Sequence, residues 1–178
     1  MAIKSLAVFC GSKSGNNPLF EEHAEQLGIL LANKKIKVIY GGGNRGIMGA
    51  IANSMMKMNG HVVGIIPTLL TKWEAQHLGI TELIVVDNMH IRKKIIYEKC
   101  DAAIILPGGF GTMDELFEML TWNQLSIHNK LIFLLNTAGF YDHLIAHTVL
   151  MQQEGFLYDT PETRMIIVNT PLELEKYF

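Results

Sequence analysis

Seven short apolar runs alternate with longer stretches of helical periodicity, and this alternation constrains the fold more than any other feature of the sequence. The predicted strands are 6–10, 37–40, 61–66, 82–86, 102–106, 130–135 and 164–168. The predicted helices are 18–33, 47–58, 89–100, 115–125, 141–153 and 171–178, and residues 68–81 are expected to be irregular or only partly helical. Repeated strand-then-helix order predicts a doubly wound, parallel, Rossmann-like α/β sheet of about seven strands, in a single domain over residues 1–178.

Composition sets limits on the class of protein. The chain has 178 residues, 49% of them hydrophobic, and a net charge of −2, which suits one well-packed domain. It has no block of Lys and Arg, so we expect neither nucleic acid nor an anionic membrane as partner. The first residues run directly into a strand without a signal-peptide pattern, so we expect a cytoplasmic location. The two cysteines, Cys10 and Cys100, lack CxxC spacing and are expected to be reduced.

The stretch 107–115, PGGFGTMDE, lies where a strand breaks into glycines and restarts as a helix. Three glycines let the backbone approach a ligand, and the first helical turn offers free N–H groups, so this stretch predicts a phosphate site. Glu115 has two interpretations. It can complete a capping box whose N-cap is Thr112, or it can be a carboxylate that does acid–base chemistry beside the phosphate. Spacing alone favours the cap.

Two other glycine loops follow predicted strands. Residues 41–46, GGGNRG, match G-x-G-x-x-G, but they follow the second strand, and the next strand does not end in the acidic residue of a dinucleotide site. Tight packing and a phosphate or ribose contact both remain open for this loop. Residues 11–15 lack the Gly-Lys-Ser/Thr ending of a Walker loop, which disfavours an NTPase. Ser12 could still donate to a monophosphate.

Several charged and aromatic residues invite a functional interpretation. Arg92 falls in the first turn of a predicted helix, where the dipole disfavours a cation, so it is either part of a solvated basic patch or paired with a carboxylate or phosphate. His143 and His147 are spaced i, i+4 but lack a His-Glu-x-x-His pattern, so we expect no metal site. Trp122 is expected to pack in the core or an interface.

Three motifs together resemble a known family. Residues 41–49 (GGGNRGIMG), 89–93 (MHIRK) and 107–115 (PGGFGTMDE, the PGGxGTxxE motif) are similar to those of the LONELY GUY (LOG) family. Members are cytokinin riboside 5′-monophosphate phosphoribohydrolases, often mislabelled lysine decarboxylases, and the resemblance covers nearly the whole chain. It implies hydrolysis of the N-glycosidic bond of a nucleoside 5′-monophosphate, such as AMP or N6-prenylated AMP. The products would be free base and ribose 5-phosphate, formed without a cofactor by a homodimer.

The resemblance also implies roles for individual residues. Arg92 and Glu115 become the catalytic pair. The substrate-binding residues, counting Arg92 again, become Ser12, Gly43, Glu74, Met89, Arg92, Lys93, Gly108, Gly109, Phe110, Gly111, Thr112, Met113 and Asp114. Of these, Glu74 matches the family less securely. Phe110 replaces a frequent Tyr and Met113-Asp114 replaces a frequent Leu-Glu, which leaves the base preference open.

Two other classes compete with hydrolysis. A non-catalytic nucleotide carrier on the same fold, such as the related molybdenum-cofactor carriers, predicts tight binding without release of base, and the presence of both Arg92 and Glu115 argues against it. A lysine decarboxylase needs pyridoxal phosphate on a buried lysine. Lys34, Lys93 and their neighbours have polar surroundings in the sequence, which disfavours a Schiff base.

Overall fold

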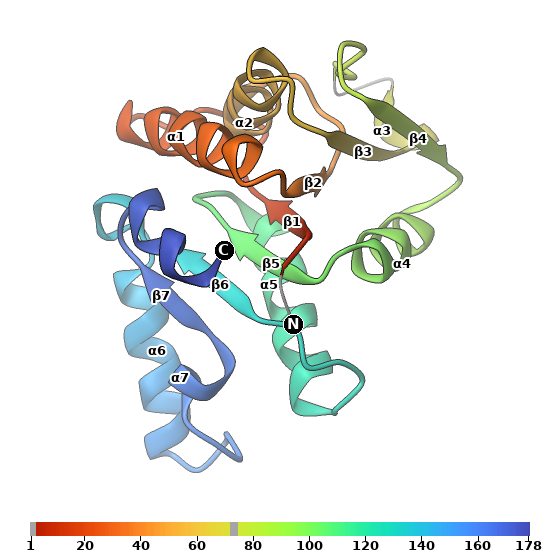
Figure 1. Ribbon diagram of the computed structural model, residues 1–178. Coiled ribbons are helices and arrows are strands. Elements are labelled where there is room, and N and C mark those ends of the chain that lie inside the picture. Colours follow the sequence, from red (N-terminus) through yellow and green to blue (C-terminus); the bar gives the residue numbers. More distant parts are fainter. Residues whose placement is uncertain (1–2, 72–74) are drawn as a thin grey trace.

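A parallel sheet forms the centre of the fold (Figure 1). The computed structural model describes residues 3–71 and 75–178. In the sheet lie β1 (Ser5–Phe9), β2 (Lys37–Tyr40), β3 (Val62–Pro67), β4 (Glu82–Val86), β5 (Ala102–Ile105), β6 (Ile132–Leu135) and β7 (Ile166–Val168). Their spatial order is β4-β3-β2-β1-β5-β6-β7, and each neighbouring pair is parallel. This confirms the predicted doubly wound α/β fold.

Helices cover both faces of the sheet (Figure 1). They are α1 (Leu19–Asn33), α2 (Gly46–Lys57), α3 (Thr68–Thr71), α4 (Met89–Lys99), α5 (Phe110–Gln124), α6 (Asp142–Gln153) and α7 (Pro161–Arg164), with 3₁₀ turns η1 (Thr137–Gly139) and η2 (Pro171–Tyr177). One core cluster joins the sheet to α1, α2 and η2, and the other joins it to α4, α5 and α6. Within the described residues, no helix combines the length and apolar character that a membrane span requires.

The central strand β1 shows how the sequence builds these two layers. Leu6 and Val8 pack with α1 and α2, whereas Ala7 and Phe9 belong to the cluster of α4 and α5. Successive side chains of a strand point to opposite faces, so a strand covered on both sides must be apolar throughout. All five residues of β1 are buried, as this requires.

The helix after β5 differs from its prediction. It begins at Phe110 rather than at Glu115, and its N-cap, Gly109, makes no side-chain capping hydrogen bond. Thr112 therefore lies inside the first turn, and the capping-box interpretation is wrong. Two further differences lie near the C-terminus, where α7 (Pro161–Arg164) was not predicted and the closing helix is a 3₁₀ turn, η2 (Pro171–Tyr177).

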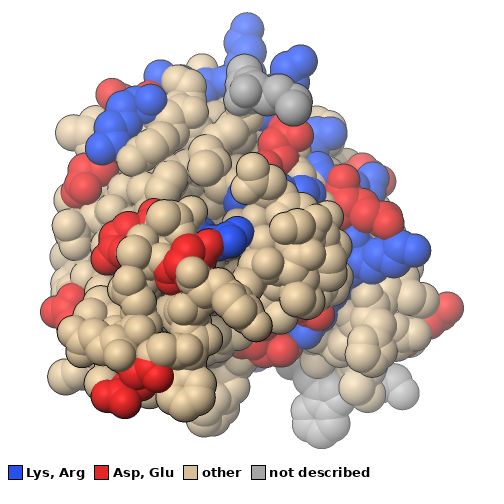
Figure 2. All heavy atoms as spheres, turned by 90° about the horizontal axis from the view of Figure 1, so that it is seen from below, with Lys and Arg blue, Asp and Glu red and all other residues tan. Residues whose placement is uncertain are grey.

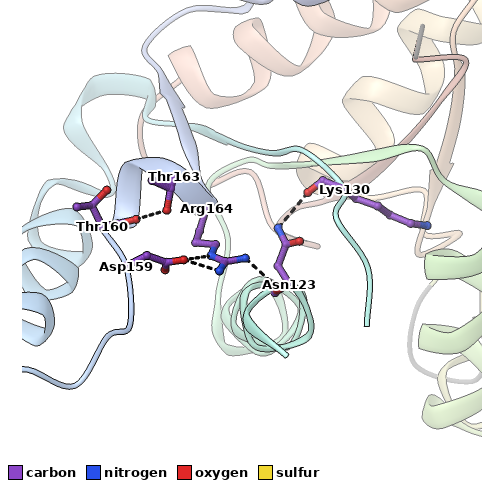
Figure 3. A network of polar contacts seen from close by, with 6 residues as sticks. All are labelled: Asn123, Lys130, Asp159, Thr160, Thr163 and Arg164. Carbon is purple, nitrogen blue, oxygen red and sulfur yellow. Dashed lines mark hydrogen bonds and ion pairs between the residues drawn. The ribbon is translucent and has the colours of Figure 1, made fainter. Parts of the chain in front are cut away.

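The C-terminal end of α5 is linked to α7 and to Lys130 by the polar contacts shown in Figure 3. Arg164 of α7 donates from Nη1 to the backbone oxygen of Asn123, 2.9 Å away, and is itself ion-paired with Asp159. The Asn123 side-chain amide donates to the backbone oxygen of Lys130 at 3.1 Å. These contacts join the C-terminal end of α5 to α7 and to the start of the segment that leads into β6.

Candidate active site

The ends of β1 and β5 mark the point where the strand order reverses. From β1 the chain winds outward through β2, β3 and β4, and from β5 it winds the other way through β6 and β7. Two backbone hydrogen bonds join the ends of these strands, from Leu106 N to Phe9 O at 2.9 Å and from Gly11 N to Pro107 O at 3.0 Å. Ligands of open α/β sheets bind in the crevice at such a reversal. A cavity of about 510 Å³ opens there.

The cavity brings together most of the predicted site residues, although they come from distant parts of the chain. Its lining includes Ser12, Met89, Arg92, Gly108, Gly109, Phe110, Gly111, Thr112, Asp114 and Glu115. Three predicted substrate contacts, Gly43, Lys93 and Met113, are not among the lining residues. Met113 instead packs against the apolar core. Glu74 lies outside the described residues. The volume is in the usual range of small-molecule sites.

The glycine-rich loop before α5 has the form of an anion cradle. The helix starts at Phe110 without a side-chain cap, so the N–H groups of its first turn have no partner within the helix. A Cβ built on Gly109 or Gly111 would meet nothing within 4 Å, so the backbone at both positions is open to a ligand. At Gly108 a Cβ would lie 2.1 Å from Thr112 Oγ1, so only glycine fits. Together these features suit a phosphate group.

Glu115 lies in the second turn of α5 and faces the cavity. Its side chain is 8% exposed, and among the described residues it has no hydrogen-bond partner and no ion pair within 4.0 Å. Burial raises the pKa of Glu115 from 4.5 to about 7, against the opposing fields of Arg92 and Lys93. A carboxyl group with a pKa near neutrality can take up and release a proton under physiological conditions.

Arg92 reaches the same cavity from the first turn of α4. It is 7% exposed, and its Nε atom is buried without a hydrogen-bond partner. Nη1 lies 3.7 Å from the sulfur of Met89. Arg92 and Glu115 form no ion pair within 4.0 Å. The guanidinium still lowers the pKa of Glu115 through its field, but it retains unsatisfied donors for an anionic ligand.

The loop 41–46 serves packing in a way that the sequence did not reveal. A Cβ on Gly41 would lie 2.0 Å from Nη2 of Arg92, so the missing side chain makes room for the guanidinium. Farther along, the oxygen of Gly42 accepts from His77 N at 2.9 Å, and Asn44 N donates to Ala75 O at 2.8 Å. Gly43 lines a smaller neighbouring cavity of about 270 Å³. The loop therefore supports Arg92 and closes the edge of the site.

Comparison with known proteins identifies the family. The protein-family model described as "Possible lysine decarboxylase" matches residues 48–178. The cytokinin riboside 5′-monophosphate phosphoribohydrolase of Rhodococcoides fascians is 43% identical, over 93% of this chain and 83% of the relative. LOG2 and LOG7 of Arabidopsis thaliana, which bear the same enzyme name, are 44% and 42% identical over 94% of this chain and over 78% and 76% of their own lengths. The chain belongs to the LOG family.

Solved structures with the same fold include proteins outside the LOG enzymes. The molybdenum cofactor binding protein of Rippkaea orientalis superposes with a TM-score of 0.71 at 23% identity, over 99% of this chain and 97% of that one. The molybdenum cofactor carrier protein of Chlamydomonas reinhardtii has a TM-score of 0.71 at 16% identity, over 94% and 91% of the two chains. At these identities the likeness establishes the fold alone.

The structure adds cavity residues to those predicted for this LOG protein. Cys10 follows β1 at the strand reversal, and burial raises the pKa of its thiol far above the usual range. Phe20 of α1 and Phe140, beyond β6, also line the cavity, and their rings pack edge to face with centroids 5.5 Å apart. Phe140 lies in the segment after the predicted strand 130–135, where a loop at the carboxyl end of the sheet was expected, whereas Cys10 fell inside the predicted strand 6–10. No sequence pattern pointed to Phe20.

The other sequence candidates lie away from the cavity lining. Trp122 packs edge to face on Tyr97 with ring centroids 4.8 Å apart, which confirms its predicted packing role. His143 and His147 lie on α6. Within residues 3–71 and 75–178 no group of three or more His, Cys, Asp or Glu side chains could hold a metal ion.

Proposed function

We propose that this chain hydrolyses the N-glycosidic bond of nucleoside 5′-monophosphates, including AMP and N6-prenylated AMP, to free base and ribose 5-phosphate. The observation that carries the proposal is Glu115, a buried carboxyl with a pKa of about 7 in the same cavity as an uncapped glycine-rich helix start. The enzyme names of relatives 42–44% identical over nearly the whole chain support it independently.

The arrangement suits this reaction for electrostatic reasons. Cleavage of the C1′–N bond builds positive, oxocarbenium-like charge on the ribose, which a nearby carboxylate stabilises. Glu115 would take a proton from the water that attacks C1′, and the departing base would receive a proton, so that one water is consumed per bond broken. Phosphate held at residues 108–112 would orient the ribose through binding energy remote from the reacting bond.

Arg92 has two tasks in this proposal. Its unsatisfied Nε and its remaining N–H groups would donate hydrogen bonds to an oxygen of the nucleotide. These bonds would offset the free-energy cost of burying the guanidinium. Its positive charge would favour the ionised form of Glu115. Arg92 would therefore affect both the affinity for the nucleotide and the pH at which Glu115 ionises.

The surface favours a small, free nucleotide over a nucleic acid. On the face shown in Figure 2, Lys and Arg side chains are interspersed with Asp and Glu and do not gather into a positive stripe. The net charge of the chain is −2. Nucleic-acid binding depends on clustered cations that neutralise several phosphates.

The decarboxylase reaction fits Lys93 poorly. Lys93 lies beside the site, but its ammonium is ion-paired with Asp114 at 2.7 Å and with Glu118 at 3.1 Å. Burial alone would lower the pKa of Lys93, yet these hydrogen bonds outweigh burial and raise it. A Schiff-base lysine requires the opposite, because the neutral amine is the nucleophile.

A homodimer and a cytoplasmic location remain proposals from the sequence. The helix 89–100 offers little apolar surface for such a contact, since Ile91 is its one exposed large apolar residue within the described chain. Exposed apolar side chains are instead found at Phe110 and Phe117 of α5 and at Leu125 and Ile127 just beyond it. A dimer formed through α5 and the turn after it would cover these four side chains.

The test is incubation of the purified protein with AMP and with N6-isopentenyl-AMP, following free base and ribose 5-phosphate by chromatography. Release by the wild type, and none by Glu115→Gln, is the expected result, and it also ranks the two bases. Nucleotide binding without release would instead favour the carrier class. An absorption band of a pyridoxal aldimine in the purified protein would favour the decarboxylase.

A further inference from the structure

Four side chains tie the helix that carries Arg92 to the helix that carries Glu115. Lys93 Nζ of α4 lies 2.7 Å from Asp114 Oδ2 and 3.1 Å from Glu118 Oε2, both on α5. The hydroxyl of Tyr97, one turn along α4, donates to Glu118 Oε2 at 2.6 Å. We call Lys93, Tyr97, Asp114 and Glu118 the α4–α5 clamp.

The clamp is sheltered enough to hold a fixed geometry. The side chains of Lys93 and Glu118 are 15% and 25% exposed, and only Asp114, at 59%, is largely in water. Tyr97 is 4% exposed, and its ring packs on Trp122 of α5 behind the ion pairs. Charge-assisted hydrogen bonds in such partly buried places are stronger and more directional than exposed surface pairs.

The clamp is also directly connected to the groups proposed to do the chemistry. Lys93 follows Arg92 in the chain, and Asp114 precedes Glu115. Arg92 and Glu115 make no direct bond that would fix their separation, so the clamp and the sheet below must set it. A misplacement of about 1 Å in a reacting group can reduce the rate about 100-fold.

We propose that the α4–α5 clamp positions Arg92 and Glu115 for the reaction, and that Lys93 acts through Asp114 and Glu118 rather than as a substrate contact. This rests on the proposed function. Lys93 is not among the residues that line the cavity, and its ammonium already has two carboxylate partners. Its role thus differs from the one implied by family resemblance.

The clamp also affects the protonation of Glu115, and here its members act in opposite directions. The positive charge of Lys93 lowers the pKa of Glu115, whereas Asp114 and Glu118 raise it. The other charged or titratable groups around Glu115 are Arg92, which lowers its pKa, and the buried thiol of Cys10. Removing Lys93 should therefore raise the pKa of Glu115, and removing Glu118 should lower it. Both changes break the same Lys93–Glu118 ion pair.

The test uses Lys93→Met, Glu118→Gln and the double variant, assayed for release of base from AMP across pH 5–9. Each single variant is expected to lose about 10- to 100-fold in kcat, and the double variant no more than the worse single, because all three break one clamp. The rising limb of the plot of kcat against pH should move to higher pH for Lys93→Met, because the pKa of Glu115 rises when the positive charge is lost. For Glu118→Gln it should move to lower pH, because a negative charge is lost. The matched controls are Lys94→Met and Glu98→Gln, which break an exposed pair on the same helix, 3.8 Å apart, and should behave as wild type.

Other outcomes would overturn the proposal. If Lys93→Met raises KM with kcat unchanged, and Glu118→Gln matches wild type, Lys93 is a substrate contact. A readout that needs no turnover is carbon-13 NMR titration of the Glu115 carboxyl in the unliganded protein. Opposite shifts in Lys93→Met and Glu118→Gln support the clamp, and no shift in either refutes it. An inactive wild type with opposite shifts would thus count against the proposed reaction alone.

Discussion

Replacing Glu115 by Gln should inactivate the protein and, above neutral pH, make it more stable. The pKa of Glu115 is 4.5 in an unfolded chain and about 7 in the folded one, chiefly because burial disfavours the carboxylate. Between these two values the folded state keeps a proton that the unfolded state releases, so the stability falls as pH rises from 4.5 to 7 and then levels off. The full difference corresponds to about 3 kcal/mol.

Glutamine has nearly the same shape as protonated glutamate and does not titrate, so the variant lacks this penalty. Relative to wild type, Glu115→Gln should gain about 1 kcal/mol in free energy of unfolding at pH 5 and about 3 kcal/mol at pH 8. The increase between the two pH values, about 2 kcal/mol, corresponds to about 4–8 °C in Tm for a chain of this length. All other titrating groups are common to both proteins and cancel in the difference.

Urea unfolding of both proteins at pH 5, 6, 7 and 8, without nucleotide, measures this difference directly. The control is Glu98→Gln, which removes a carboxyl that pairs with Lys94 on the exposed side of α4, away from the cavity. In the activity assay Glu115→Gln should bind AMP but release no base. A stability difference that stays constant with pH would mean that Glu115 is ionised normally, and the argument for its role from burial would fail.

Three other substitutions test the surroundings of the site. Gly41→Ala places a methyl group 2.0 Å from Nη2 of Arg92 and should reduce kcat/KM for AMP about 10- to 100-fold, whereas Gly79→Ala, whose Cβ meets only the ring of His77 at 3.4 Å, should not. Arg92→Ala should lower kcat/KM at least about 100-fold, and wild-type kinetics would rule out its proposed tasks. Tyr141→Phe removes the 2.6 Å hydrogen bond to the backbone oxygen of Leu106 and should cost about 1–2 kcal/mol in urea unfolding; an unchanged midpoint would contradict this.

Much of the fold followed from hydrophobic periodicity. Strands 37–40 and 82–86 have the predicted bounds, and the glycine and proline breaks set most other ends to within two residues. The pairing of β1 with β5 could not be read from local patterns, because their residues are nearly a hundred positions apart in the chain. Yet that pairing creates the strand reversal where the cavity lies.

The capping-box error has a physical explanation. A Thr followed three residues later by Glu fits an N-cap with its N3 partner, but the same spacing puts two side chains on one face of a helix. Here the glycines allow the helix to start at Phe110, so Thr112 and Glu115 both fall on a buried face, 3% and 8% exposed. The sequence carries the spacing but not the depth of burial, and burial is what changes the chemistry of the carboxyl.

The role of Gly41 illustrates the same limit. Its loop matched a nucleotide fingerprint, and the open question was whether it contacts phosphate or permits packing. The structure shows that Gly41 makes room for a side chain 51 positions away, the guanidinium of Arg92. A sequence pattern within one loop contains no information about a side chain that tertiary folding brings next to it. The pattern of residues 41–46 alone therefore could not predict that Gly41 packs against Arg92.

The proposed function gives a reason for burying Arg92 and Glu115 in one cavity despite the loss of stability. A buried guanidinium nitrogen without a partner and a carboxyl whose pKa is raised by burial both reduce stability, and a fully apolar pair would pack better. If they paired with each other, the cost would fall, but the carboxyl would be driven toward its ordinary pKa and the guanidinium would have less to offer a ligand. In the proposed function, keeping them apart would leave Arg92 as a donor to the nucleotide and Glu115 as a proton acceptor with a pKa of about 7. In the proposal, the α4–α5 clamp holds the two helices that carry these groups, while the loop at Gly41 supports the Arg92 guanidinium.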